Sequence, residues 1–358
     1  MSTKVRTAKS LALTVLRPVE PGYLILYVNN VCNLRCHMCL VWDQMQVKTN
    51  DLSLTEHVEL SKSFRNLLQL TVTGGEPLLR EDVPHIVHAY YAHSGLAKCT
   101  LVTNATYPDK TERCVQEIFN LCPDLDLSVN VSIDGPPEVH EQVRGVKGCF
   151  EKTARSLDRL IEMRRRRKNM IINVTSVISK MNWQHLDELY EFIRQRFDVD
   201  QHAFLLARGR TKDADAKEVP LKAYRWMERL LAREDGRSEH YLSLPMRALS
   251  RAMRSIVART AHTNEFVIPC VAGGQFIEIF SDGEVVPCEI IEEKRDPYLG
   301  NVRDFDLDIL KLLHSPKAIE MRDFIKRTKC RCTFECALYA SLAFNPVQYP
   351  RVLARTFS

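Results

Sequence analysis

Segments typical of strands alternate with segments typical of helices from residue 22 to residue 211, and this alternation constrains the fold most. The strand-like segments are short and rich in Val, Ile, Leu and Thr. A βα rhythm of this kind builds a parallel sheet, because the chain must cross back between successive strands. The expected strands are residues 23–28, 69–73, 98–103, 127–133, 170–178 and 201–206, and the expected helices are 54–67, 81–93, 109–121, 150–167 and 183–197.

Three cysteines stand within eight residues shortly after the first of these strands. Cys32, Cys36 and Cys39 form a CxxxCxxC run, and thiolates packed this closely select iron-sulfur clusters, zinc or copper(I). A structural zinc site is closed by four protein ligands, whereas a cubic cluster held by three cysteines leaves one iron free. The count favours an iron-sulfur cluster with an open position, with a zinc loop as the alternative.

A second motif follows the second strand. Residues 70–77 read LTVTGGEP, and together with the cysteine run they resemble the radical S-adenosylmethionine (AdoMet) superfamily. The resemblance implies a 4Fe-4S cluster whose open iron is chelated by AdoMet. It also implies cleavage of AdoMet to methionine and a 5′-deoxyadenosyl radical that removes hydrogen from a substrate. The expected fold is therefore α/β, a partial (β/α)6 TIM-like barrel that is open on one side.

The candidate motifs all follow the C-terminal ends of strands, where the active sites of barrel enzymes collect. The resemblance implies that the GGEP backbone approaches the methionine moiety, which requires glycine, and that Glu76 accepts from the AdoMet ammonium. Met38 stands where the superfamily usually has an aromatic residue, and its thioether would cover the adenine. The expected AdoMet contacts are Met38, Gly74, Gly75, Glu76, Pro77, Asn104, Ser132, Asp134 and Arg144.

Residues 132–145 resemble the SxDGxxxxHxxxRG pattern of superfamily members that carry a C-terminal SPASM or twitch domain. In this resemblance Ser132 and Asn104 hydrogen-bond the ribose or carboxylate of AdoMet, and Arg144 neutralises the carboxylate. The alternative is that Asp134 only begins a turn. His140 is expected at the surface, without a role.

A second group of cysteines lies near the C-terminus, around a hairpin whose turn is Asp282-Gly283. The group resembles twitch and SPASM modules, which carry auxiliary 4Fe-4S clusters. A full SPASM module needs seven or so cysteines, so five predict one auxiliary cluster; a closed zinc site is the alternative. Cys332 and Cys336 are the preferred late ligands, although the choice between Cys330 and Cys332 stays open. The candidate ligands are Cys270, Cys288, Cys330, Cys332 and Cys336.

Charged residues supply further candidates. Glu289 follows Cys288, and the resemblance to the sulfatase-maturating branch implies a general base there; a solvated carboxylate beside Glu292 and Glu293 is the alternative. Arg208 and Arg210 follow the sixth strand and are candidates to bind an anionic substrate group.

The motifs divide the chain into four parts. Residues 1–21 form a leader, 22–211 the barrel, 212–262 a linker with bridging helices at 221–234 and 244–260, and 263–358 a small twitch- or SPASM-like module with a C-terminal tail. No window approaches the roughly 18 apolar residues of a membrane span. Twelve cysteines without a secretory signal indicate a reducing compartment, so a cytoplasmic location is expected.

The expected activity is that of a radical AdoMet oxidoreductase acting on a small molecule, with a flavodoxin- or ferredoxin-type reductant. A peptide- or protein-modifying maturase is the first alternative, although residues 1–22 are too few for the peptide-binding domain that precedes the barrel in many peptide-modifying relatives. A zinc-binding module without activity is the second. A net charge of +5 is only mildly basic, and nucleic acid is not an expected partner.

Overall fold

The structure, a computed structural model, describes residues 3–354 except 46, 48, 49, 221, 224, 225, 227, 228, 230–243 and 292–295. Its centre is one nine-stranded sheet in the order β6-β5-β4-β3-β2-β1-β7-β8-β9. Six strands pair in parallel and agree with the expected strands to within one residue, which confirms the predicted fold class. They are β1 (Tyr23–Tyr27), β2 (Gln69–Thr73), β3 (Lys98–Thr103), β4 (Asp126–Ser132), β5 (Met170–Ile178) and β6 (Gln201–Leu206).

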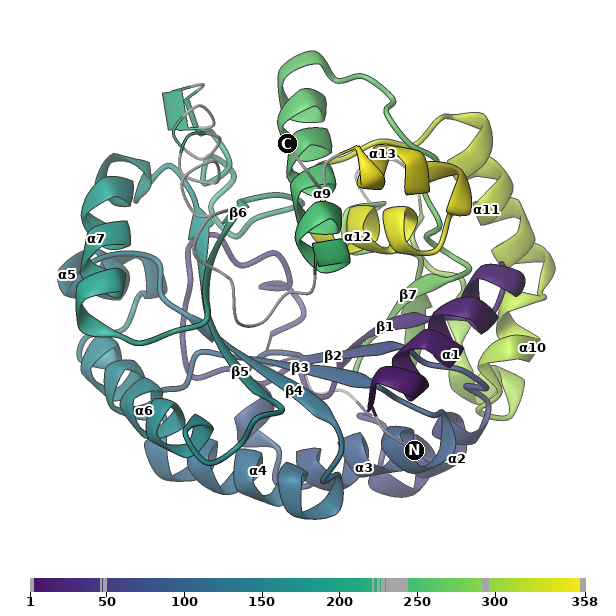
Figure 1. The fold of residues 1–358 in the computed structure, drawn as a ribbon, viewed down its shortest axis with the longest axis horizontal. Coiled ribbons are helices and arrows are strands. Elements are labelled where there is room, and N and C mark those ends of the chain that lie inside the picture. The colour runs from purple at the N-terminus through teal and green to yellow at the C-terminus, as the bar shows by residue number, and fades with distance from the viewer. Residues whose placement is uncertain are drawn as a thin grey trace.

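Helices cover the outer, convex face of the curved sheet (Figure 1). Each strand turns alternate residues toward them: in β4, Leu127 and Val129 are fully buried, whereas Ser128 and Asn130 are partly exposed. Alternation places the polar residues of β2 to β5 on the inner face, so the barrel has a polar lumen. The helices are α2 (Leu54–Lys62), α3 (Val83–His93), α4 (Pro108–Leu121), α5 (Pro137–Arg144), α6 (Cys149–Arg164) and α7 (Leu186–Arg196), with short 3-10 turns at Pro77–Leu79 and Trp183–His185.

The leader contains a helix that the sequence pattern did not predict. Helix α1 (Thr3–Leu16) packs at the N-terminal ends of β1 and β2. The carbonyl of Thr14 accepts from Gln275 Nε2 at 2.6 Å, and the carbonyl of Ser10 accepts from Asn66 Nδ2 at 2.7 Å. Residues 3–16 therefore belong to the packed structure at the end of the sheet opposite the cysteine loop.

The C-terminal part extends the same sheet. Strand β7 (Phe276–Ile279) pairs in parallel with β1, and the predicted hairpin is confirmed because β7 pairs antiparallel with β8 (Glu284–Val286). Gly283 has φ +92°, a conformation that favours glycine. The remaining elements are α9 (Leu244–Thr263), β9 (Gly300–Asn301), a 3-10 turn at Val302–Phe305, α10 (Ile309–Leu313), α11 (Pro316–Arg327), α12 (Glu335–Ala343), a 3-10 turn at Pro346–Gln348 and α13 (Tyr349–Leu353).

Two predictions about the organisation of the chain are limited by the described residues. Most of the expected bridging helix 221–234 lies outside them, whereas α9 matches the second bridging helix at 244–260. The four domain boundaries stay predictions. Among the described residues, no helix is both long and apolar enough to cross a membrane.

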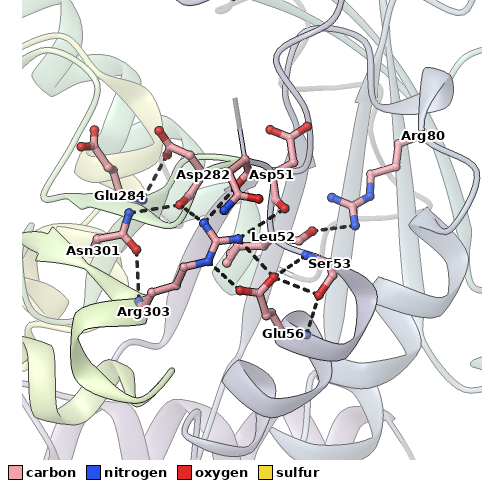
Figure 2. Close-up of polar contacts among 10 residues, drawn as sticks. Asp51, Leu52, Ser53, Glu56, Arg80, Asp282, Glu284, Asn301 and Arg303 are labelled. Carbon is pink, nitrogen blue, oxygen red and sulfur yellow. Dashed lines mark hydrogen bonds and ion pairs between the residues drawn. The ribbon is translucent and has the colours of Figure 1, made fainter. Parts of the chain in front are cut away.

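Arg303 fastens the C-terminal part to the barrel (Figure 2). Its Nε and Nη2 donate to the two carboxylate oxygens of Glu56 at 2.6 and 3.1 Å. Its Nη1 also donates to the carbonyl of Asp282, in the hairpin turn, at 2.9 Å. Glu56 belongs to the capping box that Ser53 begins at the N-terminus of α2. One guanidinium therefore joins a barrel helix to the hairpin.

We expect Glu56→Gln to lower the free energy of unfolding by about 1–2 kcal/mol. Hydrogen bonding to Arg303 is the main cause that lowers the pKa of Glu56 to about 2. Each pKa unit corresponds to about 1.4 kcal/mol, and the sum is reduced because about a quarter of both side chains is exposed. Unfolding by urea, followed by circular dichroism, measures the difference.

The effect of Glu56→Gln should also depend on pH. A carboxylate with a depressed pKa stabilises fully above its unfolded value, near 4.5, and this stabilisation is lost as the pH falls toward 2. Glu59→Gln is the matched control, because the Glu59–Lys62 pair on the same helix is more than half exposed and should contribute less than about 0.5 kcal/mol. Equal effects of the two variants would contradict the assigned role of Arg303.

Candidate functional site

The cysteine loop lies at the C-terminal end of β1 and is held by backbone contacts on two sides. The amide of Arg35 donates to the carbonyl of Arg144 at 3.0 Å, at the end of α5. The carbonyl of Cys39 accepts from the amide of Lys212 at 2.9 Å, in the segment after β6. These contacts give the loop a defined shape although it contains no regular helix or strand.

The three loop cysteines are partly buried thiols that form no disulfide. Burial raises the pKa of Cys32 to about 11 and that of Cys39 to about 12, and the neighbouring Cys36 raises the pKa of both. Binding of a Lewis-acidic metal such as iron to the sulfur would lower the pKa of such a thiol and release its proton. Three soft sulfur donors on one shaped loop fit a cubic iron-sulfur cluster with one open iron.

A buried ion pair lies beside this loop. The Asp134 carboxylate is fully buried; its Oδ2 is 2.5 Å from Arg144 Nε, and its Oδ1 accepts from the Val177 amide at 2.8 Å. Arg144 Nη1 donates a hydrogen bond to Cys36 Sγ at 3.6 Å. Arg144 therefore pairs with Asp134 and also contacts the sulfur of Cys36 in the cysteine loop. Its expected contact with AdoMet stays a prediction.

His140 and Ser132, which belong to the same sequence motif, differ in how far they are exposed. The interpretation of His140 as a surface residue was wrong, because it is 1% exposed and its Nδ1 accepts from the Asp134 amide at 3.1 Å. Burial also lowers its pKa well below the usual range, so the ring is neutral. Ser132 is partly exposed at the end of β4, which keeps it a candidate to meet a ligand.

The glycines of GGEP are required by the chain itself. A Cβ at Gly74 would lie 2.5 Å from the carbonyl oxygen of Asn29, and one at Gly75 would overlap the carbonyl of Val31. The amides of Gly75 and Glu76 donate to those two carbonyls at 2.9 and 2.8 Å. The turn is thus packed directly on the segment that leads into the cysteine loop, and any AdoMet contact of the glycines stays a prediction.

Glu76 joins the ends of β2 and β3. Its carboxylate accepts from Thr103 Oγ1 at 2.6 Å, from the Asn104 amide at 2.8 Å and from the Leu78 amide at 3.1 Å. Burial raises the pKa of Glu76 to about 6, although these hydrogen bonds oppose the shift. Three of the roughly four acceptor sites of a carboxylate are therefore used internally, which leaves room for about one further donor.

Asn104 connects β3 to the cysteine loop. Its Nδ2 donates to Asn33 Oδ1 at 3.0 Å, and its Oδ1 accepts from Thr106 Oγ1 at 2.8 Å. Asn33 Nδ2 in turn donates to Thr106 Oγ1 at 2.7 Å. Asn33 and Thr106 were not predicted as site residues. The sequence pattern around a short polar residue in a loop does not indicate which residue it will hydrogen-bond.

Met38 and Pro77 are buried. Met38 belongs to a small apolar cluster with Val143 and Ala216, and Pro77 begins the 3-10 turn after β2. Both residues pack within the chain near the C-terminal ends of the barrel strands, which we call the rim. Their expected contacts with AdoMet stay predictions.

The second cysteine group gathers at the hairpin. Cys270, Cys330 and Cys332 line one pocket between α9 and α12. Burial raises the pKa of Cys288 well above its usual range, and the nearby Cys270 and Cys332 raise it further. Cys336 is partly buried; burial raises the pKa of its thiol to about 12, although a hydrogen bond with the Tyr23 hydroxyl opposes the shift. Five soft donors lie around one hairpin, one more than an auxiliary cluster needs.

Ligand assignment within this group stays a prediction. Cys332 lies close enough to Cys270 and Cys288 to raise the pKa of both, and Cys330 also raises that of Cys270, so the choice between Cys330 and Cys332 stays open. Among the described residues, no three His, Cys, Asp or Glu side chains converge on a point that one metal ion would occupy. In a cubic cluster each thiolate binds a different iron.

An ionic cluster lies between the two cysteine groups. Arg208 Nε donates to Glu289 Oε1 at 2.8 Å, and Arg208 Nη1 donates to Glu335 Oε2 at 2.6 Å. The Tyr27 hydroxyl donates to Glu289 Oε2 at 3.2 Å, and the Glu289 amide donates to Glu278 Oε1 at 3.0 Å. Tyr27 ends β1, so Glu289 lies at the same rim as the cysteine loop.

These contacts change three interpretations. Glu289 is only 8% exposed and ion-paired, so it is not a solvated carboxylate; Glu292 and Glu293 lie outside the described residues. Arg208 does not face an open anion site, because two carboxylates occupy its guanidinium. Arg210 pairs with Asp43 instead.

Comparison with known families supports this geometry. Residues 26–193 match the family model described as the radical SAM superfamily. Residues 270–337 match the SPASM model, described as an iron-sulfur cluster-binding domain. The first match contains the cysteine loop and the GGEP turn, and the second contains all five late cysteines.

Curated relatives are similar over most of the chain. An AdoMet-dependent heme synthase of Methanosarcina barkeri is 25% identical over 291 residues, which are 76% of this chain and 77% of the relative. A GTP 3′,8-cyclase of Haemophilus ducreyi is 28% identical over 215 residues, 59% of this chain and 60% of the relative.

Solved structures share the fold. Tagged anSMEcpe with bound AdoMet has a TM-score of 0.61 and 18% identity, covering 94% of this chain and 95% of that chain. SuiB of Streptococcus suis bound to S-adenosylmethionine has a TM-score of 0.62 and 16% identity, covering 88% and 72%.

Proposed function

Because this chain is a radical SAM enzyme with a C-terminal iron-sulfur domain, we propose that it oxidises a small-molecule substrate by removing a hydrogen atom. The observation that carries the proposal is the meeting of two cysteine groups around one rim, joined by the hydrogen bond between Tyr27 and Glu289. Tyr27 and Glu289 connect the end of β1, which precedes the first cysteine group, to the residue that follows Cys288 of the second.

The cofactors of such an enzyme are a 4Fe-4S cluster, AdoMet and an auxiliary iron-sulfur cluster. We propose Cys32, Cys36 and Cys39 as ligands of the first cluster, with Cys270, Cys288, Cys332 and Cys336 as ligands of the second. When bound, the cofactors supply a hydrogen-abstracting radical and a centre that assists the oxidation or positions the substrate. The chain contributes the rim residues that hold AdoMet and the buried lumen that limits access of water.

Glu289 is the proposed general base. Removal of hydrogen from a carbon that bears a hydroxyl or amine makes that group more acidic, and a nearby carboxylate can then accept its proton. Arg208 and Tyr27 hold the two oxygens of Glu289 in place, so both are positioning residues. Proton acceptance requires the carboxylate to exchange one of these hydrogen bonds for one from the substrate.

The substrate proposal draws on the curated relatives, which are named for heme and for GTP and so for small molecules. A peptide is the alternative, because SuiB of similar fold has been solved with its precursor peptide. A flavodoxin- or ferredoxin-type reductant and a cytoplasmic location complete the proposal.

Anaerobically reconstituted protein, reduced with dithionite in the presence of AdoMet, is expected to form 5′-deoxyadenosine. Chromatography of the quenched reaction measures it, and samples without reductant are the control. Brown, iron-loaded protein that forms none would overturn the proposal. Colourless protein that retains zinc would establish the zinc-binding alternative.

A further inference from the structure

We infer that Glu278 and Glu289 together bind a cationic amino group of the substrate. This inference deepens the proposed function, on which it rests, by naming the chemical class of the substrate. It replaces the expectation that arginines after the sixth strand bind an anionic group.

Glu278 is a buried carboxylate with an unused oxygen. It lies on β7 opposite Ile25 of β1, and alternation along paired parallel strands turns it to the same face as Tyr27, toward the lumen. Its side chain is fully buried. Oε1 accepts from the Glu289 amide, whereas Oε2 has no hydrogen-bond partner among the described residues. A buried polar atom without a partner is unfavourable, so Oε2 offers an open acceptor position to a donor from the substrate.

The charges around Glu278 do not balance. Glu278, Glu289 and Glu335 place three carboxylates in one cluster, against the single guanidinium of Arg208. Arg208 is already shared between Glu289 and Glu335. Burial is the main cause that raises the pKa of Glu278, and the charge of Glu289 raises it further, whereas Arg208 opposes the shift; a cation bound at Oε2 would add to the effect of Arg208 and keep the carboxylate ionised.

The cofactors do not supply the missing cation. A cubic cluster held by four thiolates carries net negative charge, so it adds to the surplus. The ammonium of AdoMet is expected at the GGEP turn, at the end of β2, where Glu76 has one acceptor site left. An alkylammonium group of the substrate has the required positive charge and three N–H donors, enough for Glu278 Oε2 and for Glu289.

Three four-carbon probes test the charge preference. Holoenzyme saturated with AdoMet is titrated anaerobically by calorimetry with n-butylammonium, n-butanol and butanoate. We expect n-butylammonium to bind at least about tenfold more tightly than either other probe. Equal binding of the three probes would overturn the inference. So would competition between n-butylammonium and AdoMet, because the cation would then occupy the AdoMet site.

Glu278→Gln keeps the shape of the side chain and removes its charge. We expect this variant to bind n-butylammonium about tenfold more weakly, while its iron content equals that of the wild type. The matched control is Glu284→Gln on the same hairpin, where Glu284 lies beside Asp282 (Figure 2), and it should retain the full preference. An unchanged preference in Glu278→Gln would overturn the inference.

The assay separates failure of the amine site from failure of the proposed function. Formation of 5′-deoxyadenosine is measured on the same wild-type preparation. Radical formation without cation preference refutes the amine site alone. Cation preference without radical formation refutes the proposed function and leaves the acidic pair as a binding site.

Discussion

Replacing Cys32, Cys36 and Cys39 together by alanine is expected to halve the iron content and to abolish formation of 5′-deoxyadenosine. Two 4Fe-4S clusters give about eight irons per chain, and the auxiliary cysteines keep about four of them. The three thiols lie on a loop held by backbone contacts at Arg35 and Cys39, so the fold around the loop should persist. Iron is measured by a colorimetric assay after anaerobic reconstitution, and 5′-deoxyadenosine by chromatography.

A cysteine outside both groups provides the control. Cys114 lies on α4 and is only partly buried, and Cys114→Ala should retain all the iron and all the 5′-deoxyadenosine. The assignment would fail if the triple variant kept about eight irons, because the loop would then hold no cluster. It would also fail if the variant still cleaved AdoMet.

The second large effect is expected for Arg144→Met, which should lower the free energy of unfolding by about 3–5 kcal/mol. The variant leaves Asp134 fully buried beside a side chain that carries no charge. Removing one partner of a buried pair is costly because the other charge has no compensation. Urea unfolding of wild type and variant under the same anaerobic conditions measures the loss.

Two further variants establish the cause. Asp134→Asn combined with Arg144→Met removes both charges and should recover at least about 1–2 kcal/mol of the loss. Arg159→Met removes a cation whose partner Asp109 is 78% exposed, and it should change stability by less than about 1 kcal/mol. A double variant as unstable as the single one would show that the stabilisation does not arise from the ion pair.

Local pattern was sufficient for the barrel strands. Runs rich in Val, Ile and Leu bounded by polar turns located β2, β3, β5 and β6 to the residue, because a buried strand leaves its mark on consecutive positions. Helix α1 was not predicted, because the residues that it contacts, Gln275 and Asn66, are distant from it in the sequence. The parallel pairing of β7 with β1 also joins segments about 250 residues apart, which no local pattern encodes.

The candidate site divides in the same way. Spacing selected Cys32, Cys36 and Cys39 as candidate ligands, because metal ligation demands a residue type at fixed intervals. It could not foresee that Arg208 would be shared by two carboxylates, since the side chain extends from the end of β6 to residues far along the chain. The glycines of GGEP were expected to let the AdoMet methionine moiety come close, and that contact stays a prediction; the structure adds that their backbone also lies close to the carbonyls of Asn29 and Val31.

The contacts of Arg208 also determine how the barrel wall is completed. Strand pairing in the described residues ends at β6 on one side and at β9 on the other, and the guanidinium bridges from the end of β6 to Glu289 and Glu335. Side-chain ion pairs therefore connect the end of β6 to the C-terminal part of the chain, where no strand pairing among the described residues does so. These contacts are ion pairs and not backbone hydrogen bonds, so they close the wall without adding a strand to the sheet.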